Sequence, residues 1–213
     1  INLRIVRFTE GTVIVPDGTF IGCINLKEVG LPSTVKELGG SAFQDCMSLE
    51  EIQFHGEITD MGAYCFSNCI SLRSVVLNEG LTTIWENTFA NCSSLGEITL
   101  PSTVAVIKNS AFSDCVLIET IELPASLENI HHDAFHGCTN LKSITFNGSM
   151  AVSSLWAPVP LLKGLPNLSE VCINCSPENL HFLKGVQSGP ALDVYLTISH
   201  DPALSQFEFA PEP

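Results

Sequence analysis

Six cysteines recur along the chain at a constant spacing of 23 residues. They are Cys23, Cys46, Cys69, Cys92, Cys115 and Cys138. A fixed period of this length is the signature of a solenoid, in which each repeat forms one coil and neighbouring coils bury a shared core. The period therefore limits what these 213 residues can fold into more than any other feature of the sequence.

Apolar residues keep step with the cysteines. Three residues before each cysteine stands a phenylalanine: Phe20, Phe43, Phe66, Phe89, Phe112 and Phe135. Further apolar positions follow three, six and eight residues after each cysteine. Because positions six and eight alternate with their neighbours, they predict a strand with these two side chains directed inward. The segment from the phenylalanine to the cysteine is interpreted as a helical turn with the phenylalanine in the core.

These patterns predict a β-rich leucine-rich-repeat solenoid. A parallel β-sheet forms one face, and short strands and helical turns form the return side. The register breaks after Met150 and returns at Leu168 and Val171. We therefore expect regular 23-residue repeats over residues 1–150, with an incomplete first coil, and irregular terminal repeats, a cap and a tail over residues 151–213.

Two short motifs carry a resemblance to a known family. Ser-Ala-Phe-Ser-Asp-Cys at 110–115 and Leu-Pro-Ser-Thr-Val at 31–35 and again at 100–104 resemble the BspA-like leucine-rich repeat. The resemblance implies an arc-shaped solenoid with a cell-surface, secreted or host-interaction role. An extracellular or cell-surface location is accordingly expected, although one fold hosts many functions.

Charge narrows the range of partners. Acidic residues outnumber basic residues 23 to 9, which gives a formal net charge of −14. A basic stripe that could neutralise phosphates is missing from such a chain, so nucleic acid is an unfavourable partner. No run approaches the roughly 20 apolar residues of a membrane span, so we expect no membrane insertion in this segment.

The cysteines have a structural interpretation. A ladder of side chains that all point the same way does not converge on a metal, and it gives poor disulfide geometry. Buried free cysteine instead behaves as a small apolar residue. Cys172 and Cys175 have the spacing of a zinc or thiol-redox pair, but the further ligands of a zinc site are missing.

Other candidate chemistry is similarly incomplete. His131, His132 and His136 crowd one coil, where a weak metal or pH-sensitive patch competes with solvated turn residues as the interpretation. GxSxG, HExxH and phosphate-binding glycine loops are all absent from the sequence. We therefore expect no enzyme activity, no cofactor and no metal site.

The outward positions of the predicted strands are the leading candidate surface. They are polar and mildly acidic, and they form either a binding face or a plain solvated sheet. The candidate binding residues are Glu28, Glu51, Gln53, Arg73, Glu97 and Glu122. Tyr64, Trp85 and Trp156 offer an alternative contact surface on the return side or in the irregular segment, since aromatic residues often dominate binding.

Two functions from different classes follow from this sequence. The first is a non-catalytic recognition or adhesion module for a protein or glycan ligand. The second is a structural scaffold subunit inside a larger assembly, which the low charged fraction of 15% also fits.

Overall fold

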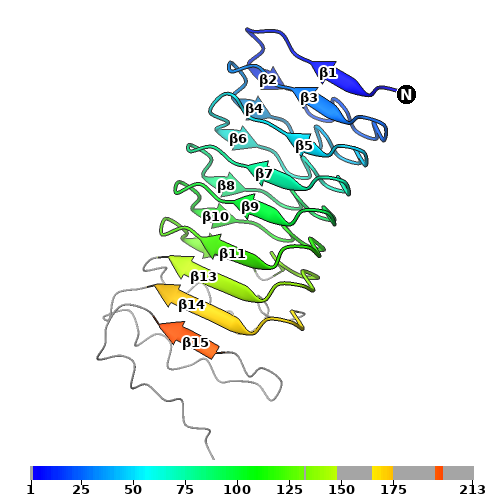
Figure 1. The fold of residues 1–213 in the computed structure, drawn as a ribbon. Helices are drawn as coiled ribbons and strands as arrows, with labels where there is room; N and C mark the ends of the chain where they lie inside the picture. Colours follow the sequence, from blue (N-terminus) through cyan, green and yellow to red (C-terminus); the bar gives the residue numbers. More distant parts are fainter. Residues whose placement is uncertain (1, 132, 148–164, 175–194, 199–213) are drawn as a thin grey trace, which may run out of the picture.

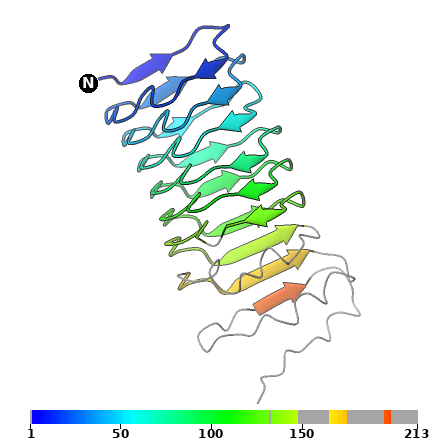
Figure 2. The ribbon, with the colours of Figure 1, turned by 180° about the vertical axis from the view of Figure 1, so that it is seen from behind.

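The computed structural model describes residues 2–131, 133–147, 165–174 and 195–198. The chain winds into coils that stack along a single axis, beginning with the coil at the N-terminus (Figure 1). Each regular coil contributes one strand to a main face and a shorter strand to the return side, which is seen from behind in Figure 2. The solenoid predicted from the 23-residue period is confirmed.

The main face is a succession of parallel strands. They are β1 (Ile5–Arg7), β3 (Glu28–Gly30), β5 (Glu51–Ile52), β7 (Ser74–Val76), β9 (Glu97–Thr99), β11 (Thr120–Leu123), β13 (Ser143–Asn147), β14 (Glu170–Asn174) and β15 (Tyr195–Ile198). Paired residues in β7 and β9 are 23 positions apart, as in the pair Val75–Ile98. Val171, where the sequence pattern returns, pairs with Ile144 of β13 and with Leu196 of β15.

The return side carries two-residue strands, also parallel. They are β2 (Ile14–Val15), β4 (Glu37–Leu38), β6 (Asp60–Met61), β8 (Thr83–Ile84), β10 (Val106–Ile107) and β12 (Asn129–Ile130). Strands β2, β4 and β6 form one sheet, and β8, β10 and β12 form another. The last residue of each strand is buried and the first is exposed or half-buried, so the return side also alternates about the core.

The segment between the return strand and the cysteine forms turns, and the described part of the chain contains no helix. In the coil of Cys46, the N–H groups of Gln44 and Cys46 donate to the carbonyls three residues earlier. The N–H groups of Phe43 and Asp45 donate instead to carbonyls of Cys65 and Ser67 in the next coil. Successive N–H groups therefore donate alternately within a local turn and to the neighbouring coil.

A left-handed backbone directly before each periodic cysteine explains why no helix forms. The residues there are Gly22, Asp45, Asn68, Asn91, Asp114 and Gly137, and φ lies between 58° and 75°. Glycine, asparagine and aspartate are the residues that enter this conformation most readily. The left-handed residue turns the chain out of the helical path, so the expected helical turn becomes a pair of tight turns.

The phenylalanines and cysteines form two ladders inside the stack. From Phe20 to Phe135, successive rings stack with centroids 5.3–5.6 Å apart. The carbonyl of Phe43 accepts a hydrogen bond from the backbone N–H of Cys46 and another from the thiol of Cys69, at 3.1 and 3.2 Å. The same thiol contact recurs at Cys46, Cys92, Cys115 and Cys138. Cysteine therefore fills a small apolar space and also supplies a weak donor to the neighbouring coil.

Replacement of Phe89 by alanine tests the ladder. Phe89 is fully buried between the rings of Phe66 and Phe112. We expect Phe89→Ala to lower the free energy of unfolding by roughly 3 to 5 kcal/mol, because it leaves a cavity that two coils cannot easily close. Denaturant unfolding of the variant and the parent chain measures this loss. A neutral effect would contradict the register of the ladder.

Candidate functional site

The outward side chains of β3, β5, β7, β9 and β11, here named the strand face, are exposed as predicted. Glu51, Glu97 and Glu122 of these strands present exposed side chains. So does Gln53, which directly follows β5 and bridges to Gly30, and we include it in the strand face. Parallel pairing aligns Glu51 with Ser74, and Ser74 with Glu97, so these side chains share one row across the coils. The strand face is therefore a continuous surface, which is polar apart from the exposed side chain of Val76 in β7.

Two of the predicted binding residues are engaged by neighbours on the surface. The guanidinium of Arg7 lies 2.5 Å from the carboxylate of Glu28. Arg73 precedes β7 and approaches Glu50 of the preceding coil at 3.5 Å. By contrast, no ion pair within the described residues compensates the carboxylates of Glu51, Glu97 and Glu122. The available charge on the strand face is thus negative.

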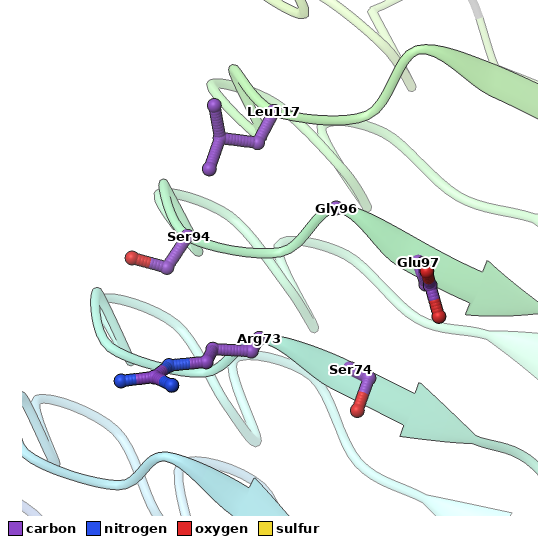
Figure 3. Close-up of a pocket in the computed structure, with 6 residues that line it drawn as sticks. All are labelled: Arg73, Ser74, Ser94, Gly96, Glu97 and Leu117. Carbon is purple, nitrogen blue, oxygen red and sulfur yellow. The ribbon is translucent and has the colours of Figure 1, made fainter.

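A shallow depression of about 450 Å³ lies where β7 and β9 begin (Figure 3). Arg73 and Leu117 project from the coils on either side of Gly96, and Ser94 comes from the turn of the same coil as Gly96. Ser74 and Glu97 complete the lining from the strands. The structure thus brings Arg73 and Glu97 of the predicted set together, whereas Glu28, Glu51, Gln53 and Glu122 lie outside this depression.

Exposed apolar side chains beside the strand face were missed by sequence reasoning. Ile24, Met47 and Ile70 each directly follow a periodic cysteine in successive coils, and they are 41–50% exposed. Leu117, in a later coil, is 47% exposed. We name these four residues the turn ridge. Ile24, Met47 and Ile70 have a fixed place in the repeat, outside the inward columns, and this was the signal that could have identified them. Leu117 lies one position further along its coil, two residues after Cys115.

The alternative aromatic surface lies on the return side. The indole N–H of Trp85 donates to the carboxylate of Asp60 at 3.1 Å, and the ammonium of Lys108 lies 5.8 Å from the centre of the Trp85 ring. Tyr64 is 43% exposed and has a left-handed backbone. The Trp85 ring is therefore held by neighbours on adjacent coils. Trp156, the third member of this set, falls outside the described residues.

The environment of the periodic thiols disfavours their reaction. All six are free and buried. Burial raises the pKa of Cys92 and of Cys138 to about 12, which disfavours the reactive thiolate. Of the candidate CxxC pair, Cys172 lies in β14, but Cys175 falls outside the described residues.

The histidines that crowd one coil lie only partly within the described residues. His131 is half-buried and His136 is exposed, while His132 is outside the described residues. Within those residues, no group of three or more histidine, cysteine, aspartate or glutamate side chains is arranged to hold a metal ion. The described residues also contain no helix that could cross a membrane.

The parallel sheet, the 23-residue coil and the inward leucine columns define a leucine-rich-repeat solenoid. The BspA type leucine-rich repeat region matches the chain in six copies, over residues 1–118 and 59–157. The chain belongs to this family. No curated protein sequence matches it.

Solved structures share the fold. A leucine-rich cell surface protein from Faecalibacterium prausnitzii is 22% identical with a TM-score of 0.63, and the match covers 81% of this chain and 64% of that protein. A leucine-rich repeat protein from Bacteroides ovatus is 23% identical with a TM-score of 0.62, over 93% of this chain and 54% of that one. The pneumococcal vaccine antigen PcpA is 19% identical with a TM-score of 0.58, over 94% and 64%. This chain thus spans less than two thirds of the length of each protein.

The burial of the cysteine ladder predicts its reactivity. We expect Cys46, Cys69, Cys92, Cys115 and Cys138 to resist a thiol-reactive probe in the native protein and to react after denaturation, because each is buried and its pKa is raised. Mass spectrometry of labelled peptides reads out each position. Disulfides among the periodic cysteines, or rapid native labelling, would contradict the ladder.

Proposed function

We propose that this chain is a non-catalytic recognition module that binds a protein partner through the strand face. The observation that carries the proposal is the set of exposed, uncompensated carboxylates on the parallel strands. Glu51 and Glu97 share one row through Ser74, and Glu122 of β11 adds a third carboxylate in a different row. Each coil adds a small contact to an extended footprint, which is how solenoids bind large partners. Leucine-rich repeats generally serve as protein-interaction scaffolds, which supports a protein as the ligand.

The negative charge of this chain favours a partner with a basic surface. The chain carries a formal net charge of −14, and the strand face has the same sign. A partner with a basic patch would therefore be attracted over a distance of about one Debye length, and would associate faster at low salt. The turn ridge beside the strands supplies apolar area that exposed carboxylates alone do not.

We assign the module to the cell surface or the extracellular space. The support comes from the BspA type repeat and from the solved leucine-rich cell surface protein of F. prausnitzii, which has the same fold. An adhesion role is the form of recognition that best fits such a location. A glycan bound by Tyr64 and Trp85 is less favoured, because Asp60 and Lys108 already engage the indole of Trp85.

One observation favours the scaffold alternative. The turn ridge exposes Ile24, Met47 and Ile70 on three successive coils, as a surface buried inside an assembly would. Association through the turn ridge would depend on apolar burial and not on charge. Charge reversal on the strand face would leave such an assembly intact, so one experiment separates the two functions.

Reversing two charges on the strand face provides that experiment. We expect the double variant Glu51→Lys and Glu97→Lys to weaken binding of a basic partner by at least about tenfold, mainly by slowing association. Surface plasmon resonance at two salt concentrations, with a partner isolated on the parent chain, measures the effect. The melting temperature should change little, because both side chains are exposed.

A matched control carries the same charge change on the other side of the coils. Glu37 in β4 and Glu128 next to β12 are exposed on the return side. We expect Glu37→Lys with Glu128→Lys to bind the partner nearly as well as the parent chain does. Equal binding by the two double variants would show that the strand face is not the site.

A further inference from the structure

One coil lacks the long side chain that the other coils carry beside the strand face. The residues four positions after the periodic cysteines are Lys27, Glu50, Arg73, Gly96, Glu119 and Lys142. Five of the six are charged and exposed or half-buried, and only Gly96 has no side chain. The backbone N–H of Gly96 donates to the carbonyl of Arg73 at 3.1 Å, which places Gly96 in the same column as its neighbours.

The fold does not require glycine at position 96. A Cβ atom built on Gly96 would meet only the carbonyl oxygen and Cβ of Leu117, at 3.8 and 4.0 Å, which is ordinary van der Waals contact. Its backbone is not left-handed. Gly62 shows the opposite case, because a Cβ there would lie 2.5 Å from the backbone nitrogen of Gly40. The gap at Gly96 is therefore not a by-product of coil packing.

The missing side chain opens the depression shown in Figure 3, which we now name the Gly96 notch. Leu117 provides an apolar wall, and Ser74 and Ser94 provide hydroxyl groups. The carboxylate of Glu97 completes the lining on the strand side. Together with the guanidinium of Arg73, these apolar, hydroxyl and carboxylate groups line one small volume.

The charge that the notch offers to a ligand depends on which of the charged side chains in and around it already form ion pairs. The carboxylate of Glu50 lies 3.5 Å from the guanidinium of Arg73 and 3.9 Å from the ammonium of Lys27, so Arg73 shares this partner with a second cation. The ammonium of Lys142 lies 2.8 Å from the carboxylate of Glu119. Within the described residues, Glu97 makes neither an ion pair nor a side-chain hydrogen bond. The notch therefore holds one carboxylate without a partner, that of Glu97, while the guanidinium of Arg73 is engaged by Glu50 outside the lining.

We propose that the Gly96 notch receives an arginine side chain of the protein partner. Its aliphatic stem would pack on Leu117, and its guanidinium would donate to the carboxylate of Glu97 and to the hydroxyls of Ser74 and Ser94. A guanidinium has five donors in a planar fork, which suits three separate acceptors better than a lysine ammonium does. This inference rests on the proposed function and gives the strand face one specific anchor.

A titration followed by NMR tests the notch without the partner. The probe is Nα-acetyl-arginine methylamide, and its control is the citrulline analogue, which has nearly the same shape and no charge. We expect saturable shifts of the backbone amides of Gly96, Glu97 and Leu117 with arginine only. In Glu97→Gln the affinity should fall by about tenfold, because a charge-assisted hydrogen bond is lost. Gly96→Leu should abolish the shifts by filling the notch.

Two alanine variants control for folding. Gly96→Ala should keep the unfolding midpoint of the parent chain, because its Cβ has room, whereas Gly62→Ala should lower the midpoint. Equal binding of the citrulline probe, or arginine shifts spread evenly over Glu51 and Glu122, would overturn the notch. If the notch fails while Glu51→Lys alone still weakens the partner complex, recognition by the strand face stands. If the probe binds as expected and Glu51→Lys has no effect, the notch stands and the wider footprint is wrong.

Discussion

Stacking of each coil on the next, in register, is the constraint on which the rest of the structure depends. Backbone hydrogen bonds join the coils along both strand ladders and along the turn segment, so the spacing between successive coils is regular. At this spacing the ring centroids of Phe43, Phe66 and Phe89 lie 5.3–5.6 Å apart. The thiols of Cys69 and Cys92 donate to the phenylalanine carbonyl of the preceding coil. A residue of another size in these columns would disturb the packing of its coil against both the preceding and the following coil. The 23-residue sequence pattern is strict for this reason.

The strict interior leaves the outer surface free to vary, and that surface is where coils differ. Inward positions repeat leucine, isoleucine, valine, phenylalanine and cysteine, while the position four residues after the cysteine changes from lysine to glutamate, arginine and glycine. These changes create the local chemistry of the solenoid: ion pairs where opposite charges meet, and a notch where Gly96 interrupts the column. Proposed recognition therefore depends on departures from the repeat, whereas stability depends on adherence to it.

The sequence predicted the coil, its register and the direction of most side chains, because a period of 23 residues fixes direction relative to the core. It could not predict that Glu28 and Arg73 are engaged by Arg7 and Glu50, since long charged side chains choose among several neighbours in adjacent coils. The left-handed residues such as Asn68 were visible in the column before the cysteine, yet the segment was interpreted as helical. The Gly96 notch was hidden for a different reason: only the three-dimensional path of the backbone shows that coil packing does not require glycine there.

Excision of one whole coil tests most directly the claim that each coil depends only on its neighbours. Removing residues 70–92 deletes 23 residues and joins Cys69 to Ser93, so every column stays in step. The account predicts a shorter solenoid that still unfolds cooperatively and keeps its remaining periodic thiols protected from a reactive probe. A deletion of residues 70–88, which shifts the columns, should expose those thiols. Loss of the folded state on excision of the whole coil, or equal tolerance of both deletions, would contradict the account.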